Sequence, residues 1–435
     1  APAPAPEPAP TPAPTPAPAA APPPVEAVTV SVGQVEPGPI APLRADWTFE
    51  TLLVGAYNRF AHAAAMSVVS SPGTMYNPLF LYGVPGTGKS HLLQAIGAAL
   101  SKGLGVGVAN TSGPRLSRAV NSALARKDMR EIDALIADSK TLLVDDVHLT
   151  AVSDANKAVL AKIFKAFFDR QQQVVLTSLY PPRALGALEE ALKFSFSKGW
   201  SVDLKLPSAS VQKDLIASAA DRSQAGLASE EIALLHEKLS QWGYQDLTLW
   251  LHRVAVFKRT REAAKQSAGL ADLIPLIYDP VVAGSAEPIK PATTSFRPPA
   301  AGAGAPPLAV IAPKGQDGVG PYAASLFYEI GAKNGLTEPY RHALWETYDP
   351  AQTYGVPFVI GDLCARARVA RALVVGPPPD SPLGARAAEL AHAVRRILDS
   401  QGVLAAWIPY NGLQQGAHYL NAHLDLLELP PKAAS

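Results

Sequence analysis

Residues 79–82 form an apolar run that leads into a glycine-rich segment ending in Lys89 and Ser90. A strand, a turn of this kind and a following helix make a phosphate-binding loop, because the glycines let backbone N–H groups face a triphosphate at the positive end of the helix. In such a loop Lys89 reaches the outer phosphates and the Ser90 hydroxyl ligates Mg²⁺. The alternative is a chance match in a chain that contains many glycines. The residues expected to bind ATP or ADP here are Gly83, Val84, Pro85, Gly86, Thr87, Gly88, Lys89, Ser90 and His91.

A second apolar run, residues 141–144, ends in two adjacent carboxylates, Asp145 and Asp146. The tip of a strand can hold one acid against Mg²⁺ and the next against the attacking water. We therefore predict that Asp145 is a metal ligand, together with Ser90, and that Asp146 polarises water. The alternative is a strand that ends in a solvated turn.

Strands and helices alternate through the first half of the chain, which predicts an α/β fold. Helices are expected over residues 50–69, 90–100, 114–137 and 156–169, and strands over 79–82, 105–109, 141–144 and 173–178. This alternation indicates a parallel sheet with helices on both faces and a nucleotide at the carboxyl ends of its strands. Only helical periodicity follows from residue 210 to 264, which predicts a small helical lid.

Shifts in composition divide the chain into five segments. They are an Ala- and Pro-rich disordered linker at 1–40, a nucleotide-binding core at 45–208, a helical lid at 209–275, a flexible linker at 276–306 and a second domain at 307–430. Alternating Ala and Pro cannot bury a core and favours an extended polyproline conformation. We interpret the first segment as a spacer, with a docking site for a proline-binding module as the alternative.

The second domain is predicted to be a smaller α/β unit with a parallel or mostly parallel sheet. Strands are expected at 308–312, 357–360, 372–376 and 403–408, helices at 322–333 and 384–400, and loops around Asp362, Asp380 and His418. Residues 315–321 form a glycine-rich turn between the first strand and helix. This turn lacks a lysine or hydroxyl at phosphate-loop spacing, so we interpret it as structural, with a ligand site as the alternative.

Composition limits which classes of partner the protein can have and in which cellular compartment it is expected. The 38 Lys and Arg nearly balance the 37 Asp and Glu, which argues against a surface that is basic throughout. The single cysteine, Cys364, excludes an internal disulfide and a cysteine zinc cluster, and we expect it to be a buried structural thiol. The sequence has no apolar run long enough to span a membrane, and a cytoplasmic location is expected. The chain opens on Ala1 in a low-complexity segment, which suggests a fragment whose upstream domain is missing.

Several short sequences, in a fixed order, indicate a family. They are Trp47-Thr48-Phe49, Asn58-Arg59-Phe60-Ala61-His62-Ala63-Ala64, Tyr76-Asn77-Pro78, Gly88-Lys89-Ser90-His91-Leu92, Leu143-Val144-Asp145-Asp146 and Val175-Leu176-Thr177-Ser178. Over residues 45–260 the chain resembles the ATPase core of the DnaA family of bacterial replication initiators, which are AAA+ ATPases. The resemblance implies an α/β core with a helical lid and a tendency to stack head to tail. It also implies that Asn58, Arg59 and Phe60 line the adenine side of the pocket, and that Thr177 and Ser178 lie near the γ-phosphate.

The chain departs from the family at positions that serve hydrolysis. The arginine that reaches the ATP of a neighbouring subunit aligns with Ser195, and the lid arginine aligns with Gln245. An arginine finger typically contributes about 10³ to 10⁵ in turnover, because it neutralises charge that develops in the transition state. Lys193 or Lys198 is an alternative source of this charge, although a lysine lacks the planar fork of arginine.

Contacts with nucleic acid also look weakened relative to the family. The positions of two basic residues that the family uses on single-stranded DNA hold Ser153 and Ala155, and nothing like the family's helix-turn-helix domain follows Arg261. A basic helix remains over 115–130, but acidic residues interleave with its cations. We interpret this helix as a solvated face, with a DNA-binding surface as the alternative.

The sequence therefore favours an ATP-binding switch or scaffold that hydrolyses ATP slowly or not at all by itself. Its expected cofactors are ATP or ADP and Mg²⁺, and its expected partners are proteins or further copies of the chain, with weakened DNA binding. One alternative is an active ATPase in DNA replication initiation or its control. Another is a small-molecule sensor carried on a structural ATPase core.

Overall fold

The protein is described by a computed structural model that covers residues 38–223, 225–242, 247–266, 268, 296–302, 304–352 and 355–428. These residues all belong to one compact unit, Val35–Ser435. The spacer expected at 1–40 lies outside the described residues except for 38–40. The linker expected at 276–306 is described only at 296–302 and 304–306.

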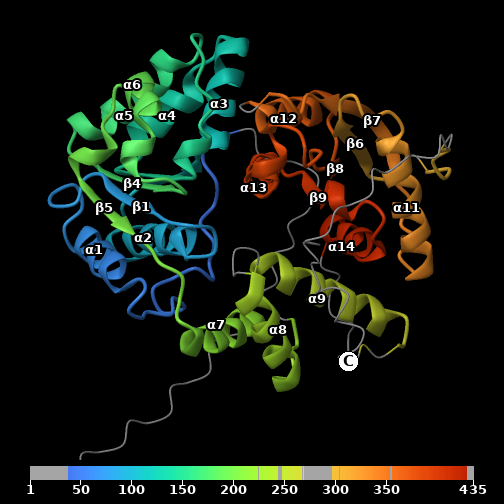
Figure 1. Cartoon of the computed structure of the whole chain (residues 1–435). Helices are drawn as coiled ribbons and strands as arrows, with labels where there is room; N and C mark the ends of the chain where they lie inside the picture. The colour runs from blue at the N-terminus through green and yellow to red at the C-terminus, as the bar shows by residue number, and fades with distance from the viewer. Residues whose placement is uncertain are drawn as a thin grey trace, which may run out of the picture. The chain divides into compact units, whose positions relative to one another are not determined.

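The first half of the chain builds a five-stranded sheet in the order β2-β3-β4-β1-β5, with every pair parallel (Figure 1). Its strands are β1 (Leu79–Tyr82), β2 (Val108–Ser112), β3 (Thr141–Asp145), β4 (Gln173–Ser178) and β5 (Trp200–Asp203). All strands run the same way, so their carboxyl ends meet at one edge of the sheet. The expected parallel α/β core is confirmed.

Helices cover both faces of this sheet. They are α1 (Arg59–Ser70), α2 (Lys89–Leu104), α3 (Gly113–Arg126), α4 (Arg130–Asp138), α5 (Lys157–Asp169) and α6 (Gly186–Leu192), with single turns η1 (Val147–Leu149), η2 (Pro182–Ala184) and η3 (Phe196–Lys198). Successive residues of β1 point to opposite faces: Leu79 and Leu81 pack in the cluster beneath α1 and α2, whereas Phe80 packs in the cluster beneath α3, α4 and α5.

Three boundaries in the core differ from the predictions. The helix expected from residue 50 begins only at Arg59, because the Asn58 amide bonds to the backbone of Leu53 and Gly55 and holds a turn before it. The helix expected over 114–137 is two helices, because Lys127 takes a left-handed conformation with φ of 54° and ends α3. The strand expected at 105–109 lies at Val108–Ser112.

A helical lid follows the core, as predicted. It consists of α7 (Ala209–Arg222), α8 (Ser229–Trp242) and α9 (Leu247–Ala263), which share an apolar cluster that includes Ile216, Leu235 and Leu251. The position predicted to replace the lid arginine, Gln245, lies outside the described residues.

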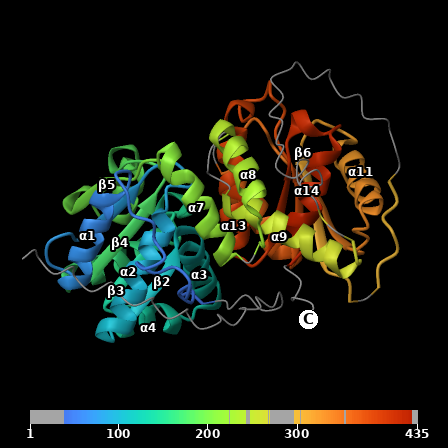
Figure 2. The ribbon, with the colours of Figure 1, turned by 90° about the horizontal axis from the view of Figure 1, so that it is seen from below.

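The second domain contains a four-stranded parallel sheet in the order β7-β6-β8-β9. Its elements are β6 (Pro307–Pro313), α11 (Val319–Lys333), β7 (Arg341–Tyr348), α12 (Val356–Ala367), β8 (Arg371–Val375), η4 (Gly384–Arg386), α13 (Ala387–Asp399), β9 (Leu404–Ile408), η5 (Tyr410–Gly412) and α14 (Gly416–Leu426). Figure 2 shows α11 beside α14 in this domain, where the rings of Phe327 and His423 stack 3.6 Å apart. The predicted second α/β domain is confirmed.

Two assignments in this domain are wrong. Residues 357–360, expected to be a strand, lie in α12, so Asp362 is helical rather than in a loop, and His418 lies in α14. The strand that the prediction missed is β7, an edge strand in which only Tyr348 is fully buried. Among the helices in the described ranges, none combines the length and apolar character that crossing a membrane requires.

Candidate functional site

The glycine-rich loop lies between the carboxyl end of β1 and the start of α2. Gly83, Gly86 and Gly88 all have positive φ, and Gly88 directly precedes the first helical residue. At Gly83 a Cβ atom would lie 2.4 Å from the carbonyl oxygen of Leu204, so only glycine fits there. The loop therefore has the backbone curvature and the helix N-terminus that a phosphate group requires.

Lys89 is buried beneath this loop. Its Nζ donates to the carbonyl oxygens of Gly83 and Val84, both at 2.8 Å, and lies 3.4 Å from Thr87 Oγ1. Burial lowers the pKa of Lys89 to about 8, although the nearby Asp146 and Asp145 favour its charged form. A cation is thus held against the backbone of the loop, next to where the outer phosphates of a nucleotide would bind.

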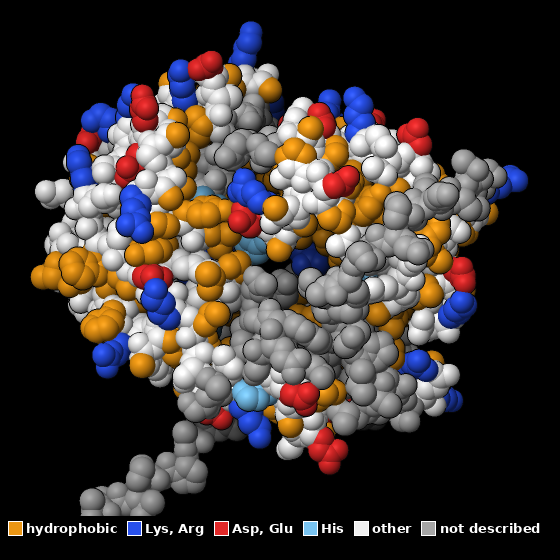
Figure 3. All heavy atoms as spheres, viewed as in Figure 1, with side chains coloured by type: hydrophobic (Ala, Val, Ile, Leu, Met, Phe, Trp, Pro, Cys, Tyr) orange, Lys and Arg blue, Asp and Glu red, His pale blue; other side chains and the backbone are white. Residues whose placement is uncertain are grey.

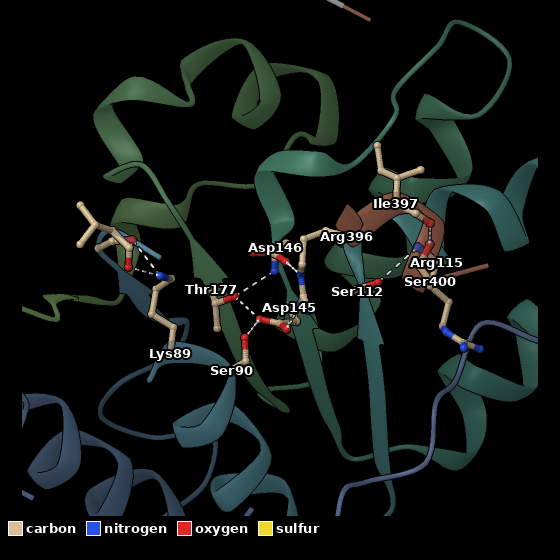
Figure 4. A network of polar contacts seen from close by, with 12 residues as sticks. Lys89, Ser90, Ser112, Arg115, Asp145, Asp146, Thr177, Arg396, Ile397 and Ser400 are labelled. Carbon is tan, nitrogen blue, oxygen red and sulfur yellow. Dashed lines mark hydrogen bonds and ion pairs between the residues drawn. The ribbon is translucent and has the colours of Figure 1, made fainter. Parts of the chain in front are cut away.

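Ser90, Asp145 and Thr177 form one hydrogen-bonded group at the carboxyl edge of the sheet (Figure 4). Asp145, the last residue of β3, accepts at Oδ1 from Ser90 Oγ at 3.0 Å and from Thr177 Oγ1 at 2.5 Å. Thr177 Oγ1 also accepts from the backbone N–H of Asp146 at 2.9 Å. The structure therefore brings together four of the residues predicted from two separate motifs and the end of β4.

Asp146 follows directly, in a left-handed conformation with φ of 49°, and its carboxylate is buried. The residue that binds both carboxylates was not predicted. Arg396, in α13 of the second domain, donates from Nη2 to Asp145 Oδ2 at 2.5 Å and from Nε to Asp146 Oδ2 (Figure 4). Arg396 lies about 250 residues from the acids in sequence, and no local spacing pointed to it.

The charges at this edge influence one another strongly. Burial and the adjacent Asp146 raise the pKa of Asp145, in spite of the opposing charge of Arg396. Burial also opposes ionisation of Asp146, but the charges of Arg396 and His148 outweigh it and lower the pKa of Asp146 to about 2. Asp146 in turn raises the pKa of Arg396, so the guanidinium stays charged.

The residues at this edge suit a hard divalent cation. The Ser90 hydroxyl and the Asp145 carboxylate lie within hydrogen-bond distance of each other, and Mg²⁺ prefers oxygen ligands of these two types. The described residues contain no group of three or more His, Cys, Asp and Glu side chains that could hold a metal ion. Magnesium sites commonly use one or two carboxylates and complete the shell with water and phosphate.

The other predicted binding residues lie apart from this group. The buried Asn58 side chain accepts from the Gly55 N–H and donates to the Leu53 carbonyl, both at 2.9 Å, so it supports the turn before α1. Phe60 is 67% exposed, with the Arg59 guanidinium 4.9 Å from its ring. His91 Nε2 lies 3.0 Å from the Thr48 carbonyl, which ties α2 to the segment that precedes the core.

The residues considered for the missing arginine finger make local contacts. Ser195 Oγ lies 3.4 Å from Glu189 Oε1, Lys193 caps α6 in a left-handed conformation, and Lys198 Nζ lies 5.3 Å from the Phe168 ring. Ser178 is buried and accepts from the backbone N–H of Tyr180 at 2.9 Å.

The basic residues at 115–130, expected to form a solvent-exposed face, are only partly exposed. Arg126, Lys127 and Arg130 are exposed. Arg115 and Arg118 are half-buried, and they donate to the backbone carbonyls of Gly38 and Ser400 at 3.3 and 2.5 Å. The first half of the helix thus packs against other parts of this chain.

Comparisons with known proteins agree on the first half of the chain. Residues 43–203 match the family model described as the bacterial DnaA ATPase domain. The chromosomal replication initiator protein DnaA of Chloroflexus aurantiacus is 32% identical over 233 residues, which are 52% of this chain and 48% of that protein. The chain spans about half the length of the curated relatives that it matches first.

Two solved structures are similar to the same part of the chain. Domain III of the Thermotoga maritima replication initiation protein DnaA aligns with 54% of this chain and 97% of its own, at 27% identity and a TM-score of 0.48. AMPPCP-bound DnaA from Aquifex aeolicus aligns with 53% of this chain and 86% of its own, at 21% identity and a TM-score of 0.39.

Proposed function

We propose, on the premise that residues 43–203 match the bacterial DnaA ATPase domain, that the protein binds ATP and ADP with Mg²⁺ and acts as a nucleotide-dependent switch or scaffold. By itself it hydrolyses ATP slowly or not at all. The observation that carries the proposal is that Lys89, buried against the phosphate-binding loop, lies near the hydrogen-bonded group of Ser90, Asp145 and Thr177.

Each residue of this group has a defined task in the proposal. Lys89 supplies positive charge to the outer phosphates, and its low pKa reflects a buried amine whose charge water screens little. Ser90 and Asp145 hold Mg²⁺, which would neutralise phosphate charge when bound. Thr177 orients Asp145 through one hydrogen bond and fixes the backbone of Asp146 through another. In the proposal, Asp146 polarises the attacking water.

Slow hydrolysis follows from the residue at the arginine-finger position. Ser195, aligned with the arginine finger, is a short neutral side chain next to Glu189. Without an arginine finger from a neighbouring subunit, the charge of the transition state is stabilised less, by a factor of about 10³ to 10⁵ in turnover. Binding of the nucleotide does not depend on the arginine finger, so we expect the protein to bind ATP even where it hydrolyses ATP slowly.

Isothermal titration calorimetry and a radiolabelled hydrolysis assay test the two halves of the proposal. We expect a Kd for ATP and ADP in the micromolar range or tighter, lost in Lys89→Ala and kept in Lys165→Ala, whose ammonium is exposed on α5. Absence of any heat with Mg²⁺ and nucleotide would overturn the binding half. Turnover of about 1 s⁻¹ that Asp146→Asn abolishes would overturn the slow half.

A second candidate is a role on DNA in replication initiation or its control, favoured by the name of the curated relatives. On the face drawn in Figure 3, Lys and Arg side chains alternate with Asp and Glu rather than gathering in one patch. We therefore expect weak DNA binding. Gel shifts on single- and double-stranded DNA at increasing salt test this, since affinity based on phosphate contacts must fall steeply with salt.

A further inference from the structure

One face of α13 presents a row of polar residues to the AAA+ core. Glu389, His392, Arg396 and Ser400 are spaced by three, four and four residues, so they lie along one side of the helix and its C-terminal end. The opposite side carries apolar residues that are buried within the second domain: Leu390, Val394, Ile397 and Leu398. The helix thus belongs to the second domain through one face and contacts the core through the other.

The polar row contacts three separate elements of the core. At one end, Glu389 Oε2 accepts from the Tyr180 hydroxyl at 3.3 Å, just after β4. In the middle, Arg396 binds Asp145 and Asp146 at the end of β3. At the other end, the Ser400 carbonyl accepts from Arg118 of α3 at 2.5 Å.

The second domain is also bonded to the lid. Arg253 of α9 donates from Nε and Nη2 to the two carboxylate oxygens of Asp425 in α14, at 2.6 and 2.9 Å. Leu336 and Leu424 of the second domain pack within the lid's own apolar cluster. Core and lid are therefore both attached to the same domain.

The bonds of Asp145 leave little capacity for a metal ion. Its Oδ1 accepts from Ser90 and Thr177, and its Oδ2 accepts from Arg396. A guanidinium and Mg²⁺ next to the same carboxylate repel each other, and in a buried site water screens that repulsion little. A cavity of about 200 Å³ adjoins this ion pair, lined in part by Gln94, Asn110, Arg115 and Arg396. The Arg396 side chain therefore borders open space into which it can move when it leaves the carboxylates.

We propose that α13 is an intramolecular latch: Arg396 and Mg²⁺-nucleotide compete for Asp145 and Asp146, so loading the nucleotide site with its metal releases α13 from the core. The latch rests on the proposed binding of Mg²⁺-nucleotide at the phosphate loop. It makes the second domain the part of the chain that responds to the nucleotide, because one of the contacts that hold this domain to the core is made to Asp145, the carboxylate that the metal needs.

Calorimetry with ATP, with and without Mg²⁺, tests the competition in wild type and Arg396→Ala. Removing the guanidinium should tighten binding of Mg²⁺-ATP by roughly 5- to 150-fold, the usual range for coupling between sites. Binding of ATP in EDTA should be unchanged. The matched control is Arg366→Ala, an exposed arginine of α12 that bonds only within its own helix among the described contacts, and it should behave as wild type.

Hydrogen exchange on the wild-type protein gives a second readout that needs no variant. Mg²⁺-ATP should speed amide exchange in Ala387–Asp399, whereas ATP in EDTA should not. Equal Mg²⁺-ATP affinities in wild type and Arg396→Ala, or exchange in α13 that Mg²⁺-ATP leaves unchanged or slows, overturn the latch alone. Absence of binding in every variant, with and without Mg²⁺, overturns the proposed function and the latch with it. If Arg396→Ala does not fold, the exchange experiment decides.

Discussion

Breaking the ion pair between Arg253 and Asp425 tests how strongly this pair stabilises the contact between the lid and the second domain. The Asp425 side chain is 1% exposed and the Arg253 side chain 8%, and two hydrogen bonds join them at 2.6 and 2.9 Å. Asp425→Ala leaves a buried guanidinium without its carboxylate. Breaking a buried pair in this way costs about 3–5 kcal/mol of unfolding free energy, mostly because the remaining charge is desolvated.

The assay must report on this region rather than on the whole chain, since a protein with several domains need not unfold in one step. Amide exchange in α9 and α14, measured with increasing urea, gives the local free energy of opening. Asp425→Asn keeps the shape and one acceptor oxygen, so it should cost less than alanine. The double variant Arg253→Met with Asp425→Leu should recover part of the loss, because it removes both charges of this pair. Recovery is not complete, because Arg395, whose Nη2 lies 3.8 Å from Asp425 Oδ2, also loses this carboxylate.

A matched control separates burial from charge. Lys165 and Asp169 form an exposed pair on α5, with side chains 69% and 54% exposed, so Asp169→Ala should cost no more than about 1 kcal/mol. If Asp425→Ala also costs less than about 1 kcal/mol in α9 and α14, the reasoning from the buried pair is refuted.

Three further changes test packing, pH dependence and the site. Gly199→Ala would bring a Cβ within 1.9 Å of a backbone oxygen at the start of β1 and should destabilise the core strongly in thermal melts, whereas Gly186→Ala, with open space, should not. Burial lowers the pKa of His423 to about 4, so the unfolded chain binds more protons between pH 6.5 and 4. Stability should therefore fall by up to roughly 3 kcal/mol as the pH drops through that window, and urea titrations of His423→Phe should show a flatter pH profile. Thr177→Val removes the hydroxyl that donates to Asp145 and orients it. Calorimetry should therefore show weaker binding of Mg²⁺-ATP but unchanged binding of ATP in EDTA.

The phosphate loop and the acids at the end of β3 could be predicted because the residues of each motif are consecutive in the sequence. Strand, glycines and Lys89 are adjacent in sequence, and parallel strands bring their carboxyl ends to one edge, which places Asp145 near Ser90. The same local logic missed Arg396. The carboxylates that it binds lie in another domain. From the sequence alone, an arginine in an amphipathic helix cannot be told from a solvent-exposed one.

The misread segments of the second domain have local causes as well. Residues 357–360 contain Val and Ile, which favour a strand, but Pro357 lies in the first turn of α12, where proline is well tolerated. The strand β7 was missed because it lies at the edge of its sheet, where half of its residues are exposed and three more are half-buried, so its apolar pattern is weak. A four-residue apolar run cannot by itself separate a strand from part of a helix.

Cys364 has a practical consequence for following the second domain in solution. It is the only cysteine in the sequence, its side chain is fully buried, and burial raises the pKa of its thiol to about 12. Maleimide dyes react with thiolates, so the native thiol should remain unlabelled in the folded protein. A fluorophore pair attached at two introduced surface cysteines, one on α5 and one on α12, would then report changes in interdomain distance on a wild-type background.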